Sequence, residues 1–278
     1  MTTFDDALSR IDEWKVENAA TAVVAADGGI LASHGDLEQP YRLASVTKPL
    51  TAYATLVAVE EGVFDLESPA GPEGSTVRHL LAHASGLDFS EDRVRAAPGA
   101  RRIYSNRGFD VLADALSLHA GIPFDVYLDE AVLTPLGMTA SRLDGSAGAG
   151  AISSAADLAR FAAELQNPTL IAQQTLDEAT RVAFPDLDGV LPGFGAQRPN
   201  DWGLGFELRD GKSPHWTGSR NSPETFGHFG QSGTFLWIDP RAGAGCVLVT
   251  DRDFGPWAAQ AWPAFSDGVL EALESLGH

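Results

Sequence analysis

The sequence predicts an α+β fold in which both ends of the chain build one antiparallel sheet flanked by helices, with a mostly helical lobe inserted between them. Two patterns support this prediction. Short apolar segments typical of strands occur at residues 20–35 and again from about residue 200, whereas the middle of the chain carries mostly the apolar spacing of helices. A single sheet that joins the two strand-rich ends is the economical arrangement. We therefore predict a sheet lobe made of residues 1–68 and 201–278, and a helical lobe of residues 69–200.

The first elements lead to a serine at the start of a helix. Apolar residues recur at helical spacing over residues 3–16, and residues 20–35 are typical of a hairpin that turns at two adjacent glycines. Residues 49–62 then predict another helix, and Pro49 fits only in its first turn. This arrangement places Ser45 at or near the N-terminus of that helix.

The remaining elements follow the same division. Four segments in the middle of the chain predict helices, at residues 76–86, 105–121, 123–137 and 153–167. After residue 200, strands are predicted at residues 202–208, 226–239 and 244–253, and a hairpin turn joins the last two. The tail predicts a helix over residues 257–276, with Pro263 as a kink or a late start.

Composition argues against several kinds of partner. The formal net charge is −19, and a surface of that sign repels nucleic acid and anionic lipid, so we expect neither as a partner. The one cysteine, Cys246, stands in an apolar run, and we expect it to be buried and without an internal disulfide. The first residues show no basic segment followed by an apolar one, and no run approaches the ~20 apolar residues of a membrane span. We therefore expect a cytoplasmic protein.

A serine and a scarce lysine form the first candidate pair. Lys48 is one of only three lysines among 19 basic residues, and it follows Ser45 by three positions. Helix residues at that spacing share one face, with Cβ atoms about 5–6 Å apart. A lysine whose pKa is lowered can take the proton of a serine, which an arginine cannot do, and the helix N-terminus can offer N–H groups to an oxyanion. The alternative is a capping serine beside a solvated lysine.

Two further segments offer polar groups of the same kind. Tyr104, beside an ammonium, would have a lowered pKa and could move protons, and Asn106 could bind a substrate amide. The alternative is an aromatic anchor for a loop, with Asn106 or Ser105 capping the next helix. His228 on a strand would project into a cleft, and Gly230 would let a substrate lie along the strand edge. Taken alone, His228 fits a structural role better than a functional one.

Other chemistries lack their signatures. His79 and His83 stand four residues apart on a predicted helix, a spacing that can bind a metal, but no glutamate lies between them and no third ligand is indicated. The sequence has no Gly-x-Ser-x-Gly segment and no glycine-rich phosphate loop before a helix. We predict neither a metal nor another cofactor.

Three short motifs resemble, in their order, those of a known superfamily. They are Ser-Val-Thr-Lys at residues 45–48, Tyr-Ser-Asn at 104–106 and His-Phe-Gly at 228–230. Longer segments such as LLAHASGL, YLDEAVLTPLGM and FGHFGQSGTFLWIDP extend the likeness over about residues 20–255. The chain resembles the serine β-lactamase and penicillin-binding-protein superfamily, in the class C β-lactamase-like branch that includes esterases and D-aminopeptidases. This implies a β-lactamase/transpeptidase-like fold with the active site between the two lobes.

The resemblance implies three catalytic residues. Ser45 would attack a carbonyl and become acylated, while Lys48 and Tyr104 would share the removal of its proton and the delivery of one to the leaving group. Which of the two is the base in acylation stays open at this point.

The resemblance also implies the binding residues. Asn106 would hydrogen-bond the acyl side of the substrate, and the backbone N–H groups of Ser45 and Gln231, the residue after Gly230, would hold the oxyanion. His228 stands where many relatives have a lysine, so it would bind a substrate carboxylate only when protonated or through a neutral N–H group.

The predicted function is a serine hydrolase that acts through an acyl-enzyme on a small ester or amide. Peptidase-like action, weak β-lactam hydrolysis and acyl transfer in place of hydrolysis stay open, as do the physiological substrate and the oligomeric state. The alternative is a covalent sensor that does not turn over, or an inactive scaffold of the same fold. The three complete motifs favour the enzyme.

Overall fold

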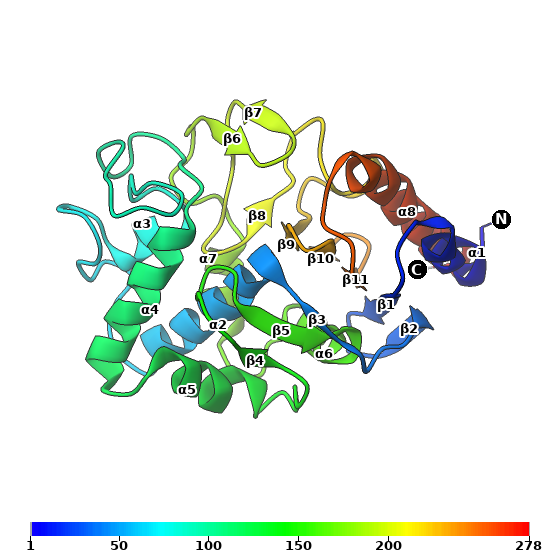
Figure 1. Ribbon diagram of the computed structural model, residues 1–278, viewed down its shortest axis with the longest axis horizontal. Coiled ribbons are helices and arrows are strands. Elements are labelled where there is room, and N and C mark those ends of the chain that lie inside the picture. The colour runs from blue at the N-terminus through cyan, green and yellow to red at the C-terminus, as the bar shows by residue number, and fades with distance from the viewer. Residues whose placement is uncertain (1, 278) are drawn as a thin grey trace.

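The centre of the protein is a six-stranded antiparallel sheet with the strand order β2-β1-β11-β10-β9-β8. The computed structural model describes residues 2–277. Figure 1 shows the sheet between α1 and α8 at one end of the molecule and α3, α4 and α5 at the other. The strands are β1 (Ala19–Ala25), β2 (Ile30–Gly35), β8 (Glu207–Leu208), β9 (Phe226–Gly230), β10 (Thr234–Asp239) and β11 (Ala244–Thr250).

The two ends of the chain meet in the middle of this sheet. β1 pairs with β11 along its whole length, from Ala19 opposite Thr250 to Ala25 opposite Ala244. The α+β fold class predicted from the sequence is therefore confirmed, with an antiparallel sheet built from both termini. The proposed division at residues 68 and 200 stays a prediction.

Helices cover both faces of the sheet, which explains why β11 is buried at every position. Along β11, Cys246 and Leu248 pack in the core beneath α8, whereas Val247 and Val249 pack in the larger core that includes α2 and α6. Successive residues of a strand point to opposite faces, so a strand covered on both sides reads as a continuous apolar run. Cys246 is fully buried and unpaired, as predicted.

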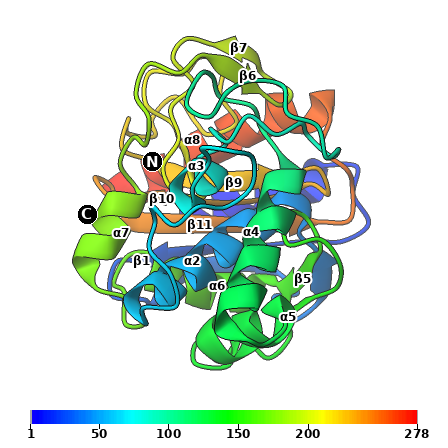
Figure 2. The same cartoon turned by 90° about the vertical axis from the view of Figure 1, so that its left-hand side faces the viewer.

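The helices follow the predicted order with changed lengths. Figure 2 shows α4 and α5 in front of α2 and the sheet when the molecule is turned by 90°. The α-helices are α1 (Phe4–Leu8), α2 (Thr47–Glu60), α3 (Val77–Leu81), α4 (Asn106–Ala120), α5 (Phe124–Leu128), α6 (Ala155–Glu164), α7 (Gln173–Ala179) and α8 (Pro256–Ser275). Short 3₁₀ segments cover Ser9–Glu13 and Ala44–Val46, and a π-helical turn covers Asp129–Leu133.

Several predictions about the extent of elements were wrong; of the strand predicted over residues 202–208, only Glu207–Leu208 is a strand. The helix predicted over residues 76–86 ends at Leu81, because His83 takes a left-handed backbone with a φ of 55°. The strand predicted over residues 226–239 is two strands, β9 and β10, joined by a tight turn in which Gly233 has a φ of 81°. The α-helix predicted over residues 3–16 is α1 followed by a 3₁₀ segment.

Two small sheets and the helix α7 were not predicted from the sequence. β3 (Pro40–Arg42), β5 (Ala151–Ser154) and β4 (Arg142–Leu143) form one small sheet, and β6 (Gly189–Leu191) pairs with β7 (Gly195–Gln197) in the other. These strands are two to four residues long, too short to show an alternating pattern.

Within residues 2–277 no single helix meets the length and hydropathy expected of a membrane span; α4 together with residues 124–133 does so only as a sharply bent pair.

Candidate active site

Ser45 lies in the 3₁₀ turn that leads into α2. Its predecessor, Ala44, has a φ of 44°, in the left-handed region that a residue with a Cβ seldom adopts. This turn bends the chain from β3 into α2, and Pro49 is the third residue of that helix, where its missing N–H costs no helical hydrogen bond. Ser45 is thus one turn ahead of the regular helix, and Lys48 is in the helix's first turn.

Lys48 is fully buried and makes three polar contacts. Its Nζ lies 3.3 Å from Ser45 Oγ, 2.5 Å from Asn106 Oδ1 and 2.7 Å from the Gly148 carbonyl oxygen. Burial lowers the pKa of Lys48 well below its usual value, and the negative charge of Asp110 opposes this only in part. Two of the three partners can only accept hydrogen bonds, so a neutral amine uses its two N–H groups on them. Its lone pair is then left facing the Ser45 hydroxyl.

Tyr104 lies beside Lys48, which contacts the face of its ring. Lys48 Nζ is 4.6 Å from the centre of the Tyr104 ring, and the Tyr104 hydroxyl is 3.4 Å from His228 Nε2. Burial raises the pKa of Tyr104, and a hydrogen bond with Ser45 opposes this only in part. The predicted lowering of this pKa is therefore wrong, because burial of the phenol outweighs its hydrogen bond with Ser45. Tyr104 is held as a phenol, which can donate a proton.

His228 is neutral in this environment. Its pKa is lowered to about 3, first by burial and then by the positive charge that Lys48 can carry, while a hydrogen bond to Phe229 opposes the change. Nδ1 lies 2.6 Å from the Phe229 carbonyl oxygen, so Nδ1 carries the proton and Nε2 is an acceptor facing Tyr104. His228 thus has neither a positive charge nor a free N–H with which to bind a carboxylate. A contact between His228 and the substrate stays a prediction, and in it His228 Nε2 would accept a hydrogen bond.

Gly230 brings the end of β9 against the turn that carries Ser45. A Cβ built on Gly230 would collide with the Leu43 carbonyl oxygen and would lie 2.5 Å from Thr234 Oγ1. Thr234 Oγ1 in turn donates a 2.9 Å hydrogen bond to the same Leu43 oxygen. Glycine is therefore needed at position 230 because two protein segments pack closely there. The reason predicted from the sequence was instead a substrate lying along the strand edge.

Gln231 follows at the point where β9 ends. Its side chain donates to the Phe254 carbonyl oxygen at 3.0 Å, and its own carbonyl accepts from the Phe254 N–H at 2.7 Å. Among residues 2–277 the Gln231 N–H has no backbone or side-chain acceptor in the recorded hydrogen bonds. It is therefore available for an oxyanion, as a donor beside Ser45 must be.

Ser45 and Gln231 both open into one pocket of about 150 Å³. The lining residues are Ser45, Phe89, Tyr104, Leu191, Pro192, Trp202, Glu207, His228, Phe229 and Gln231. The structure thus brings together four of the predicted site residues at the pocket, with Lys48 buried behind Ser45. Asn106 and Gly230 are not part of the lining. The oxygen of the Asn106 amide is used by Lys48, and its role in binding the acyl side of a substrate stays a prediction.

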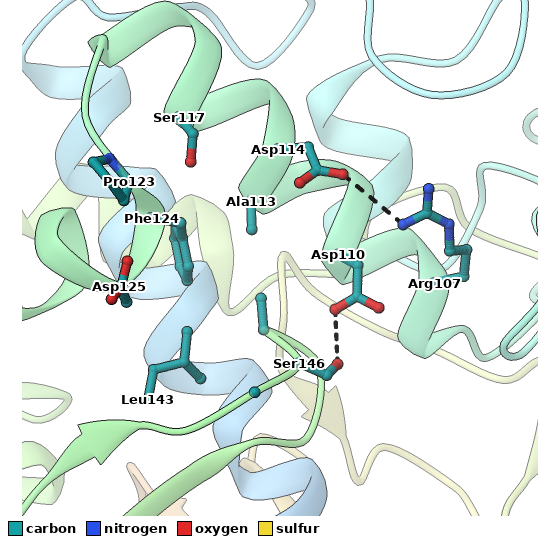
Figure 3. A pocket seen from close by; sticks show the side chains of 12 residues that line it. Arg107, Asp110, Ala113, Asp114, Ser117, Pro123, Phe124, Asp125, Leu143 and Ser146 are labelled. Carbon is teal, nitrogen blue, oxygen red and sulfur yellow. Dashed lines mark hydrogen bonds and ion pairs between the residues drawn. The ribbon is translucent and has the colours of Figure 1, made fainter.

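A second pocket lies on the far side of Lys48, and it shows what holds the Gly148 carbonyl in place. In Figure 3, Asp110 on α4 faces Ser146 on the loop before β5. Ser146 Oγ donates to Asp110 Oδ1 at 2.7 Å and accepts from the Gly148 N–H at 3.1 Å. Gly148 packs so closely on α4 that a Cβ would lie 3.1 Å from the Asn106 Cα. The loop before β5 therefore supplies an acceptor for Lys48.

His83 is a site residue whose position sequence reasoning missed. Its Nδ1 accepts a 3.1 Å hydrogen bond from the Ser105 N–H, and its carbonyl oxygen accepts one of 2.9 Å from the Ile103 N–H. The His83 ring lies 4.6 Å from the Tyr104 ring, centre to centre. The only signal was its spacing from His79, which suggested a metal pair. The residues that the structure describes contain no cluster of three metal-ligating side chains.

Glu207, at the edge of the pocket, is the centre of a buried polar cluster. Its carboxylate accepts from Lys212 Nζ at 2.5 Å, His215 Nε2 at 2.8 Å and Trp216 Nε1 at 2.7 Å. Burial alone would raise the pKa of Glu207, but the positive charges and hydrogen bonds of His215 and Lys212 outweigh it and lower the pKa to about 2.

Because of this cluster, the free energy of unfolding should decrease at acidic pH. The pKa of Glu207 is lowered from 4.5 to about 2 on folding, so its contribution is present above pH 4.5 and is lost as the pH falls toward 2. We expect Glu207→Gln to lower the free energy of unfolding by about 3 kcal/mol at pH 7, because it leaves Lys212 without its buried counter-charge. Urea unfolding at pH 7 and at pH 3 measures this. A deficit that does not shrink at pH 3 would contradict the assignment.

The contact at Gly230 gives another expected result. Gly230→Ala should push β9 away from Leu43 and lower kcat/KM for a cleavable ester by about 10²-fold, because a displacement on the order of 1 Å in a catalytic group costs that much. Gly211→Ala is the matched control, since a Cβ at Gly211 meets no atom within 4 Å. Steady-state assays of both variants provide the measurement. Equal activities in the two variants would show that this packing does not position the donor.

A family model and several solved structures match this chain over most of its length. The Beta-lactamase family model matches residues 10–269. A crystal structure of a β-lactamase (Mb2281c) from Mycobacterium bovis superposes with a TM-score of 0.95 at 58% identity, covering 96% of this chain and 99% of that one. EstCE1, a hydrolase with promiscuous acyltransferase activity, superposes with a TM-score of 0.77 over 94% of this chain and 96% of its own, and at 18% identity shows the fold alone.

A curated relative is more distant and matches in part. The D-alanyl-D-alanine-carboxypeptidase/endopeptidase AmpH of Escherichia coli K12 is 28% identical over 139 residues. That match covers 37% of this chain and 36% of AmpH, so the chain spans about a third of the length of this relative. These similarities agree with the resemblance found from the three motifs and with a β-lactamase/transpeptidase-like fold.

Proposed function

Because the chain belongs to the beta-lactamase family, we propose that it is a serine hydrolase that cleaves a small ester or amide through an acyl-enzyme on Ser45. The observation that supports this most is the environment of Lys48. A fully buried amine with a lowered pKa has two of its hydrogen-bonding directions fixed by carbonyl oxygens and the third directed at Ser45 Oγ. That is the arrangement a base needs in order to activate a serine.

Acylation begins when the Lys48 lone pair takes the Ser45 proton. Ser45 Oγ then attacks the substrate carbonyl, and the N–H groups of Ser45 and Gln231 hold the resulting oxyanion. The leaving group departs with a proton from the Tyr104 hydroxyl, and the Lys48 ammonium returns a proton to Tyr104. The raised pKa of Tyr104 favours this role over that of a phenolate base, so we assign the base in acylation to Lys48.

Deacylation uses the same groups in reverse. A water molecule attacks the acyl carbonyl while Lys48 accepts its proton. When the tetrahedral intermediate collapses, the Ser45–acyl bond breaks and Lys48 gives the proton back to Ser45 Oγ. An alcohol that takes the place of water would produce acyl transfer, the side activity named for EstCE1.

A panel of chromogenic substrates tests the proposal. It combines p-nitrophenyl esters of several chain lengths, a chromogenic cephalosporin and D-amino-acid p-nitroanilides, each run beside Ser45→Ala. Multiple turnovers that disappear in the variant, with an acyl adduct on Ser45 in mass spectra, are the expected result. Release of one equivalent and no more would indicate the covalent sensor instead, and no release with any substrate would indicate an inactive scaffold.

A further inference from the structure

The pocket beside Ser45 is lined by five apolar and five polar residues, and the charged one among them, Glu207, is an anion. Five of its lining residues are apolar, namely Phe89, Leu191, Pro192, Trp202 and Phe229. None of the lining residues that the structure describes is a lysine or an arginine. The one histidine, His228, presents an acceptor nitrogen, which repels an anion.

Two buried cations outside this lining, Lys212 and Arg102, are held by other partners. The ammonium of Lys212 donates to Glu207, to the Asp201 carbonyl and to the Leu208 carbonyl, which accounts for all three of its N–H groups. The guanidinium of Arg102 donates to four backbone carbonyls, those of Ala82, Ala183, Phe184 and Asn200. Lys212 has no N–H group left for a substrate carboxylate, and four of the five N–H groups of Arg102 are taken by backbone carbonyls.

We propose that the part of the substrate that enters this pocket is a small, uncharged, apolar group, so that the enzyme selects neutral esters or amides and rejects their carboxylate-bearing counterparts. This inference rests on the proposed function and narrows it. An ionised carboxylate in such a pocket would lose its hydration and gain no counter-charge, whereas an aliphatic or phenyl group would gain apolar contact. A volume of about 150 Å³ fits a short chain or a single ring.

Matched substrates test this directly. In the first series, methyl 4-nitrophenyl succinate is compared with mono-4-nitrophenyl succinate, which differs by a charge on the acyl side. In the second, phenyl acetate is compared with 3-carboxyphenyl acetate, which places the charge on the alcohol side. We expect kcat/KM to favour the neutral member by at least about tenfold in one or both series. Equal or faster cleavage of the anionic member in both series would overturn the inference.

Measurements at two salt concentrations distinguish a preference created in the pocket from repulsion by the charged protein surface. With a net charge of −19, the whole protein repels anions at long range, but that effect is screened over about 3 Å at 1 M ionic strength. A preference created inside a low-dielectric pocket persists under those conditions. The comparison is therefore made at 0.15 M and at 1 M salt, and a preference that vanishes at 1 M would also overturn the inference.

Phe89 allows the preference to be reversed. Its side chain lines the pocket and is 50% exposed, so a lysine at this position can keep its ammonium hydrated at the mouth. We expect Phe89→Lys to raise the anionic-to-neutral ratio of kcat/KM by about tenfold, whereas Phe89→Met, the uncharged control of similar length, leaves the ratio near that of the parent. An unchanged ratio in Phe89→Lys, with activity on the neutral ester retained, would count against the pocket as the selector.

The two levels of the proposal fail in different ways. If no neutral ester is cleaved, or if cleavage survives in Ser45→Ala, the serine hydrolase assignment is refuted. If neutral and anionic esters are cleaved equally well and both reactions require Ser45, the hydrolase stands and only the selectivity is refuted.

Discussion

Ser45→Ala is expected to lower kcat by about 10⁴-fold or more on any substrate that the parent enzyme turns over. The hydroxyl is the atom that forms the acyl bond, and the remaining oxyanion donors and pocket contacts accelerate attack by water only weakly. The side chain is partly exposed, and its loss removes only the 3.3 Å contact with Lys48 and the hydrogen bond with Tyr104, so the thermal midpoint should stay close to that of the parent.

Two measurements complete that experiment. Ser90→Ala, at an exposed serine next to Phe89, serves as the matched control and should retain the parent's activity. An acylating fluorescent probe should label the parent and the control but not Ser45→Ala. Hydrolysis by Ser45→Ala within tenfold of the parent would exclude this residue as the nucleophile.

Lys48→Arg is expected to be as damaging as Lys48→Ala, with kcat/KM reduced by about 10²–10⁴-fold in each. A guanidinium does not lose its proton in proteins, so it cannot remove the one on Ser45. The site also has room for one amine between Asn106 and Gly148, and the larger planar group would displace these acceptors. Lys15→Arg, at an exposed position, is the control and should be unaffected.

The pH profile separates a base from a positioning group. Because burial lowers the pKa of Lys48 well below its usual 10.5, the neutral amine is present at lower pH than for an exposed lysine. The acid limb of kcat/KM should therefore lie well below pH 10.5 in the parent and should be absent from the residual activity of both Lys48 variants. A substantially active Lys48→Arg enzyme with an unchanged limb would contradict proton transfer by this residue.

Local rules in the sequence were enough for the elements that carry the site. Pro49 located the first turn of α2, and α4 begins and ends where its signals predicted, with Ser105 Oγ accepting from the Gly108 N–H and Gly121 in the left-handed region. The motif residues Ser45, Lys48 and Tyr104 do lie together. The spacing of Ser45 and Lys48 at the start of α2 is short-range information that survives folding.

The surroundings of those residues depend on distant segments and could not be inferred. The pKa of Tyr104 was predicted to fall and instead rises, because burial outweighs the hydrogen bond with Ser45. Gly148 and His83 act through backbone contacts that no side-chain pattern reveals. The small number of lysines was also an incomplete guide to catalytic residues. Lys212 is another of the three lysines, and it is held in a buried ion pair with Glu207.

The pairing of β1 with β11 has a consequence for the order in which the protein matures. Strands more than 200 residues apart in the chain must meet before the central sheet exists, and contacts of such long range form late and slowly. During synthesis, Ser45 and Lys48 leave the ribosome long before the segment that ends in Gln231 and the strands that hold it. A nascent chain would thus carry its nucleophile and amine well ahead of its oxyanion donor, and chemistry would begin only once the carboxyl-terminal strands have docked.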